Sequence, residues 1–260
     1  MNKFIDWHFL VQKGMYFDET RNLKDWSFYF SKIIRDSYWN YAVHKTNFSE
    51  INRSSLKEIE TIFEAENRSP CIYVTNRDDK IIKVLSSLYG YNLLFEESFM
   101  VYQNQIDCKY QYQNYKVKRV SCDNEIEDFM SVFVSAYGGD KTPEQPYGEL
   151  DATYYNALLN SFAYDEKFFH FICYEGPQAV SIATLCFTDG KGGIYNVGTD
   201  PRFRGGGYGS AVTNACMNQW NLLQGKVLFL QTETGSAVEQ WYKSKGFETI
   251  FTGRGLIKEL

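Results

Sequence analysis

The residues that could do chemistry gather in one stretch near the end of the chain, IYNVGTDPRFRGGGYGSAVTNACMNQW (194–220). Here Pro201 ends a predicted strand, and four glycines follow within five positions before an amphipathic helix begins. Free backbone N–H groups and the positive end of a helix dipole meet at such a helix start, and glycines let a ligand approach the backbone. The pattern predicts a site for a phosphate group; a glycine-rich turn that binds no ligand is the alternative.

Two common phosphate-binding loops do not fit these residues. A P-loop requires Lys before its Ser or Thr, but Ser210 directly follows Gly209. The dinucleotide pattern G-x-G-x-x-G also fails, because the sixth position is Ser210 when counted from Gly205 and Val212 when counted from Gly207. These mismatches argue against ATP in a P-loop and against NAD or FAD, and they leave some other nucleotide as a remaining alternative.

The pattern that fits is Arg-x-x-Gly-x-Gly, written here as Arg204-Gly205-Gly206-Gly207-Tyr208-Gly209. Together with the preceding VGTDPRF, it closely resembles the pyrophosphate loop of the GCN5-related N-acetyltransferase (GNAT) family. The resemblance implies that this loop and Ser210 hold the pyrophosphate of acetyl-CoA. It also implies that Val197, Gly198 and Thr199 pair with the pantetheine arm, in a splayed gap between their strand and the next.

A second segment, YKSKGF (242–247), is also similar to this family. The resemblance makes Tyr242, four residues before the glycine, the acid that protonates the departing CoA thiolate. A tyrosine with pKa near 10 can do this only if it is positioned as a hydrogen-bond donor, and such catalysis typically contributes about 10²- to 10⁴-fold. The alternative is a core tyrosine, one among twenty.

The same segment departs from the family pattern at two positions. Gly235 stands where members often have Asn, which puts one CoA contact in doubt, and Val238 stands where they often have Ala. Ser236, at the same helix start, is the residue we expect to substitute for the Asn.

The attacking amine must lose a proton to a base or a water chain near the thioester. Glu233, at the end of the strand VLFLQTE, is our first candidate for the base. Asp200, Glu149 and Asn196 are less favoured candidates. Each of these also fits a solvated or capping role.

The histidines and cysteines predict no metal site. His8, His44 and His170 have no ligand spacing, and the six cysteines include no Cys-x-x-Cys pair. We expect reduced core thiols.

Strands and helices must position the loop and Tyr242. In the second half we expect a strand at 116–120, helices within 125–138 and at about 151–163, and a hairpin joining KFFHFICY to AVSIATLCF. A third strand, IYNVGT, leads to the loop, and strand, helix and closing strand follow it. This order predicts an α/β (α+β) fold with a mixed central sheet flanked by helices.

The first half resembles a degenerate copy of the second. A helix at 54–68 comes first. After it, the strand CIYVT, a helix at 78–89 that stops at Gly90, and a strand running to Tyr102 repeat the order seen around Tyr242. Ser86 stands where the acid tyrosine would be, and the loop motif is missing. We therefore expect two tandem GNAT-like domains, residues 1–115 and 116–260, joined through the polar stretch 104–116, with the first inactive.

Composition narrows the remaining possibilities. The formal net charge of −5 and the 44% hydrophobic content indicate a globular protein that attracts neither nucleic acid nor an anionic membrane through bulk charge. The N-terminus lacks a signal-peptide core and no stretch could span a bilayer, so we expect a cytoplasmic protein. We predict an N-acetyltransferase that moves an acetyl group from acetyl-CoA to a small-molecule or peptide amine, releasing CoA, with an acyl-CoA-binding or sensing module as the alternative. The sequence selects neither the acceptor nor the oligomeric state.

Overall fold

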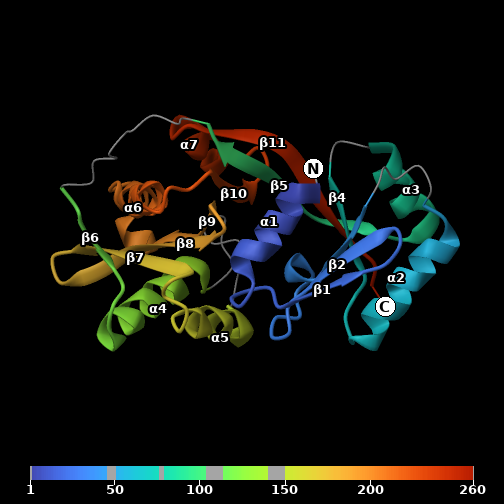
Figure 1. Ribbon diagram of the computed structural model, residues 1–260, viewed down its shortest axis with the longest axis horizontal. Helices are drawn as coiled ribbons and strands as arrows, with labels where there is room; N and C mark the ends of the chain where they lie inside the picture. Colours follow the sequence, from blue (N-terminus) through green and yellow to red (C-terminus); the bar gives the residue numbers. More distant parts are fainter. Residues whose placement is uncertain (1, 46–50, 76–78, 104–113, 140–149, 260) are drawn as a thin grey trace. The chain divides into compact units, whose positions relative to one another are not determined.

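The computed structural model describes residues 2–45, 51–75, 79–103, 114–139 and 150–259 (Figure 1). The chain forms two compact units. The first unit contains residues 1–9, 16–103 and 231–260, and the second contains residues 10–15 and 104–230. Within the described residues, no helix is long and apolar enough to cross a membrane.

The second unit is built on a sheet with strand order β6-β7-β8-β9-β10. Neighbouring strands are antiparallel except for β9 and β10, which are parallel. Helix α6 covers one face of this sheet, and α4 and α5 cover the other (Figure 1). The elements are β6 (Lys116–Arg119), α4 (Asp123–Tyr137), α5 (Ala152–Ser161), β7 (Phe168–Glu175), β8 (Gln178–Thr188), β9 (Lys191–Thr199), the 3-10 turn η3 (Pro201–Phe203), α6 (Tyr208–Leu222) and β10 (Val227–Glu233), whose last three residues belong to the first unit.

Local sequence explains the strands of the second unit. The apolar run in β7 is buried over six consecutive residues, as expected for a strand covered on both faces. The hairpin between β7 and β8 forms as predicted, with Glu175 opposite Gln178. Asp189 and Gly190 both have positive φ between β8 and β9, the conformation of a tight hairpin turn. The predicted strands and helices of this half are therefore confirmed to within a few residues.

The first unit has strand order β1-β2-β3-β4-β11-β5-β10. Helices α2 and α3 are amphipathic, and the buried face of α2 packs Leu56, Ile59 and Phe63 into one apolar cluster with Trp26 and Phe28. The elements are α1 (Asn2–Gln12), β1 (Glu19–Asn22), β2 (Trp26–Phe30), the 3-10 turn η1 (Ser37–Trp39), β3 (Tyr41–His44), α2 (Arg53–Ala65), β4 (Cys71–Thr75), α3 (Asp79–Tyr89), β5 (Asn92–Tyr102), α7 (Ala237–Ser244) and β11 (Phe247–Ile257).

The last strand of the chain lies among strands of the first half. β11 sits between β4 and β5 and is antiparallel to both. This pairing explains why residues 231–260 belong to the first unit, whereas the predicted domains divide the chain at 115/116. The predicted repeat is visible in the order of elements, because β4-α3-β5 matches β10-α7-β11 and β3 runs parallel to β4 as β9 runs parallel to β10. The predicted connection at 104–116 lies mostly outside the described residues.

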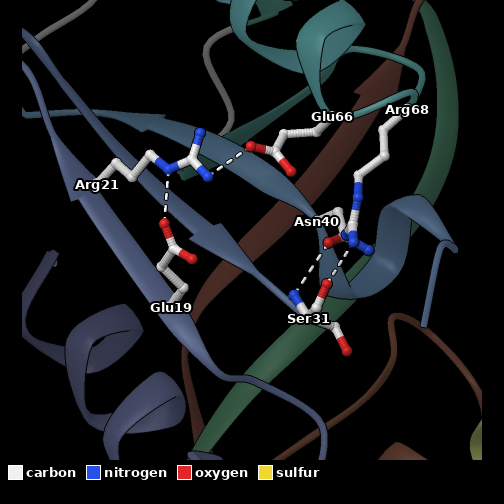
Figure 2. A network of polar contacts seen from close by, with 6 residues as sticks. All are labelled: Glu19, Arg21, Ser31, Asn40, Glu66 and Arg68. Atoms are coloured by element: carbon white, nitrogen blue, oxygen red, sulfur yellow. Dashed lines mark hydrogen bonds and ion pairs between the residues drawn. The ribbon is translucent and has the colours of Figure 1, made fainter. Parts of the chain in front are cut away.

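A group of charged and polar residues in the first unit form ion pairs and hydrogen bonds with one another. Figure 2 shows the Arg21 guanidinium between the carboxylates of Glu19 and Glu66, at 2.6 and 2.5 Å. Arg68 donates to the backbone oxygen of Ser31, whose N–H donates to the side chain of Asn40. These contacts tie β1 and the loop after β2 to the end of α2, so we assign this cluster a structural role.

Glu97 on β5 is a buried carboxylate and gives a testable pH dependence. It accepts hydrogen bonds from the hydroxyls of Tyr38 at 2.5 Å and Tyr73 at 2.6 Å, and in the described residues no Lys or Arg pairs with it. Burial raises its pKa above the ordinary 4.5, although the two hydroxyls oppose the shift. Because the folded state then holds the proton more tightly than the unfolded state, stability is lost as the pH rises from 4.5 through the raised pKa.

We expect Glu97→Gln to be more stable than the wild type at pH 7.5 by about 1 kcal/mol or more, because it removes a buried charge that has no cationic partner. The gain should shrink toward pH 4.5, where the wild-type carboxyl is protonated. Thermal melts at several pH values measure this. Glu96→Gln is the matched control on the same strand, since Glu96 pairs with Arg254 at 2.6 Å and should show no such gain. Equal shifts in the two variants would contradict the prediction.

Candidate active site

The edge of β9 opens beside the glycine-rich loop. β9 and β10 are paired only from Lys191 to Gly193 and from Val227 to Phe229. From Ile194 to Thr199, β9 is paired with β8 alone. The predicted gap therefore includes Val197, Gly198 and Thr199, which pair with no strand on the side of β10 in the described residues.

A β-bulge interrupts β9 at this edge. Ile182 lies opposite Gly198 while Thr184 lies opposite Tyr195, so Asn196 and Val197 together face one residue of β8. Asn196 has φ of 54°, in the left-handed region. A bulge of this kind redirects a backbone group out of the ladder and is common next to active sites. The hydroxyl of Tyr137, from α4, donates to the backbone oxygen of Val197 at 2.9 Å, which fixes the peptide at the bulge.

The loop glycines adopt conformations that other residues avoid. Gly205 and Gly207 have φ of 82° and 81°, and Gly207 is the N-cap of α6. A Cβ at Gly207 would overlap the hydroxyl of Tyr115, which itself donates to the backbone oxygen of Gly206 at 3.0 Å. A side chain at Gly207 would therefore collide with Tyr115, whereas the space beside Gly205 is open.

The start of α6 presents unpaired donors. Gly207 supplies no side-chain cap, and the first N–H bonded within this turn is that of Ala211, which donates to Gly207. In the part of the chain that the structure describes, the N–H groups of Tyr208, Gly209 and Ser210 have no backbone acceptor. Three such donors at the positive end of a 15-residue helix are able to bind an anion.

The neighbouring charged residues hold the loop in place. Asp200 is buried and receives the Arg202 guanidinium at 3.0 and 2.8 Å, and these contacts lower the pKa of its carboxyl. Asp200 also caps η3, so it is engaged as a cap and an ion pair rather than held ready as a base. Arg204 reaches back to the backbone oxygens of Thr199 and Ala136. Glu149, another of the candidate bases, lies outside the described residues.

Gly198 is required because α4 packs directly on β9. A Cβ added at Gly198 would lie 2.8 Å from the Cβ of Ala136 and 2.9 Å from the ring of Tyr137. We expect Gly198→Ala to destabilise the protein by about 1 to 3 kcal/mol, the usual range for overpacking, because α4 must move away from the strand. Thermal melts measure this. Gly209→Ala is the control, because its Cβ would meet only the Thr199 hydroxyl at 3.3 Å; equal losses would show that the contact with α4 is not responsible.

The remaining predicted site residues belong to the first unit. Tyr242 lies on α7, is 5% exposed, and packs against the rings of Trp241 and Phe247. Ser236 is the N-cap of α7, accepting from the N–H of Glu239 and donating to the backbone oxygen of Glu233. Glu233 ends β10 with an exposed side chain. Their catalytic and cofactor roles stay predictions.

Glu239 orders the start of α7. Its carboxylate accepts from Gly235 N–H at 2.7 Å and from Thr249 at 2.6 Å and pairs with Lys243 at 3.0 Å. These contacts, the hydrogen bond from Thr249 first, lower its pKa to about 2. The carboxylate thus stays charged and holds the segment that carries Tyr242.

Two residues of the site have no sequence signal, and a third has only a weak one. Tyr115 contacts the loop and Tyr137 contacts the bulge, both through backbone oxygens, and a backbone acceptor leaves no pattern in the sequence. Asn196 was predicted only as a candidate base, whereas the structure shows it as the left-handed residue of the bulge. Asn is one of the few residues other than Gly that tolerate this conformation, and that tolerance is the only hint the sequence held.

Comparison with known protein families gives one match. Residues 166–249 match the acetyltransferase (GNAT) domain, a segment that includes the bulge, the loop, α6, β10 and Tyr242. This chain contains a GNAT domain. A search of curated proteins finds no significant sequence match.

Solved structures agree with the GNAT fold over nearly the whole chain. A GCN5-related N-acetyltransferase from Kribbella flavida is 15% identical, with a TM-score of 0.68 over 98% of this chain and 95% of the other. One from Sphaerobacter thermophilus is 11% identical, with a TM-score of 0.67 over 91% and 81%. A tandem GNAT protein from the clavulanic acid biosynthesis pathway is 8% identical, with a TM-score of 0.61 over 90% and 78%. At these identities the likeness concerns the fold, and it confirms the predicted GNAT fold with a GNAT-like first half.

Proposed function

We propose that this protein is an acetyl-CoA-dependent N-acetyltransferase that acts on an amine by direct attack. The observation that supports it most is the combination, on one strand and the helix after it, of an open edge, a bulge and three free helix-start donors within a GNAT domain. The three features match the three parts of an acyl-CoA: the pantetheine arm, the thioester and the pyrophosphate. We place the activity in the cytoplasm as part of the same proposal.

In this proposal each group has one task. The backbone of Val197, Gly198 and Thr199 holds the pantetheine arm, and the loop from Arg204 to Ser210 holds the pyrophosphate. The N–H of Val197, which lies in the bulge, polarises the thioester carbonyl, as an oxyanion-hole donor does. The amine attacks that carbon, Glu233 accepts the amine proton directly or through water, and the C–S bond breaks as Tyr242 protonates the sulfur of CoA.

Calorimetric titration of the full chain with acetyl-CoA tests the cofactor, with CoA, NAD and ATP as comparison ligands. We expect one saturable site for acetyl-CoA and CoA and none for NAD or ATP. Failure of acetyl-CoA to bind would overturn the proposal. A panel of amines, assayed by release of the CoA thiol, then identifies the acceptor class.

The second candidate is a module that binds acyl-CoA without catalysis. The observation that favours it is the burial of Tyr242, which is only 5% exposed. Tight acetyl-CoA binding with no thiol release across the amine panel would select this candidate.

A further inference from the structure

A chain of side-chain hydrogen bonds runs from the bulge of β9 into the core of the second unit. The Asn196 side-chain nitrogen lies 3.3 Å from the hydroxyl of Thr184 on β8. That hydroxyl lies 2.9 Å from Nδ1 of His170 on β7, and Nε2 of His170 lies 3.1 Å from the hydroxyl of Ser161. Thr184 and Ser161 are fully buried and His170 is 4% exposed.

The donor and the acceptor of each of these side-chain hydrogen bonds can be assigned by starting from Ser161, the innermost residue. Ser161 donates to the backbone oxygen of Leu158 at 2.6 Å, so its oxygen accepts from Nε2–H of His170. Burial lowers the pKa of His170 to about 3, so the ring is neutral and Nδ1 is an acceptor. Thr184 therefore donates to Nδ1, and its oxygen is left to accept from the Asn196 amide.

Aromatic rings hold the imidazole of His170, in the middle of this series of hydrogen bonds, in a fixed position. The ring of Phe162 stacks on His170 with centroids 4.0 Å apart, and Phe129 meets it edge-on at 5.2 Å. A buried imidazole locked in one tautomer gives Thr184 only one orientation. These hydrogen bonds thus connect the side chain of Asn196 to rigidly held residues of the core.

The left-handed conformation costs most L-residues about 1 to 2 kcal/mol, and although Asn tolerates it better than most, the contacts of Asn196 must favour it over ordinary strand geometry. We propose that Thr184, supported by His170 and Ser161, is a positioning residue that holds Asn196 in this conformation and so directs the Val197 N–H at the thioester carbonyl. The final step rests on the proposed function; the conformational step does not.

Two substitutions, one at each end of the hydrogen bond between Asn196 and Thr184, test the proposal. Thr184→Val keeps the shape of the side chain but removes the hydroxyl that accepts from the Asn196 amide, which then keeps its contact with the sulfur of Met15 at 3.8 Å. We expect kcat to fall about tenfold while KM and Kd for acetyl-CoA stay unchanged. Loss of a whole oxyanion-hole donor costs about 10²- to 10³-fold, and a misdirected donor should cost less. Asn196→Gly removes the amide but still permits positive φ, so it provides the background in which the contribution of Thr184 is measured again.

The double variant separates positioning from general loss of stability. In the Asn196→Gly background there is no amide to anchor, so Thr184→Val should cost little further activity. Thr188→Val is the matched control on the same strand, because among the described residues the Thr188 hydroxyl bonds only the neighbouring Phe187 oxygen. An equal loss from Thr184→Val in both backgrounds, or an equal loss in the control, would overturn the proposal.

Nuclear magnetic resonance decides the conformational step without any activity. The backbone coupling constant and Cα shift of Asn196 report its φ, and we expect left-handed values in the wild type and extended values in Thr184→Val. Left-handed values in both proteins would overturn the proposal even if acetyl-CoA binds. A protein that binds no acetyl-CoA but shows the expected change would overturn the proposed function and leave the positioning role of Thr184 on Asn196 standing.

Discussion

Replacing Tyr242 with Phe should lower kcat by about 10²-fold and leave the Kd for acetyl-CoA nearly unchanged, if this hydroxyl protonates the leaving sulfur. Tyr242 is 5% exposed and packs against Phe247, and Phe fills the same space, so the fold should survive. The change removes one proton donor, which acts when the C–S bond breaks rather than when the cofactor binds. Steady-state kinetics with the best amine, together with calorimetry, measure the two quantities separately.

Tyr91→Phe is the matched control for this substitution. Tyr91 is fully buried in the core of the same unit, and its hydroxyl has no hydrogen-bond partner in the described residues, so its removal should change neither activity nor fold. If Tyr242→Phe retains full kcat, Tyr242 is a core residue and another group protonates the sulfur. If both variants lose activity together, the losses come from packing.

A pH profile adds a second test of the same role. An acid that must be protonated loses its function as the pH rises through its pKa, so the alkaline limb of kcat should be present in the wild type and absent in Tyr242→Phe. A limb that persists in the variant would belong to a different group, such as the acceptor amine itself.

Elements that depend on local pattern could be predicted from the sequence. CIYVT and VLFLQTE form β4 and β10 with the predicted bounds, because each is a continuous apolar run between clear breaks. Helix ends shifted slightly where the cap was a different residue. α2 begins after Asn52, which shares a capping box with Ser55, rather than after Ser54.

Features that depend on distant partners could not be predicted. β11 was expected as the closing strand of the second half, but which strands it joins depends on surfaces far away in the sequence, and it pairs with β4 and β5. The bulge at Asn196 arises from a mismatch in register between β8 and β9, and neither strand shows it alone. The loop and the acid candidate are therefore predictions from the sequence, whereas the bulge that contains Val197 is visible only in the structure.

Replacing Gly207 with Ala should raise the Kd for CoA at least about tenfold, which corresponds to about 1.4 kcal/mol. Two effects combine here. Gly207 has φ of 81°, which costs a residue with a Cβ about 1 to 2 kcal/mol, and the new Cβ would overlap the Tyr115 hydroxyl. The N-cap of α6 must move to relieve the backbone strain and the overlap. This movement misaligns the N–H groups of Tyr208 and Gly209 that we assign to the pyrophosphate.

Two further glycine variants separate these effects, because each has similar strain without the overlap. Gly205 lies in the loop with φ of 82°, and Gly14 lies far along the chain with φ of 93°; neither has an atom within 4 Å of an added Cβ. Calorimetry with CoA should show the largest loss for Gly207→Ala, a smaller loss for Gly205→Ala and none for Gly14→Ala, while thermal melts show a destabilisation in all three. Equal Kd values for Gly207→Ala and Gly14→Ala would mean that the phosphates bind elsewhere, because a site built from the start of α6 cannot tolerate displacement of its own N-cap.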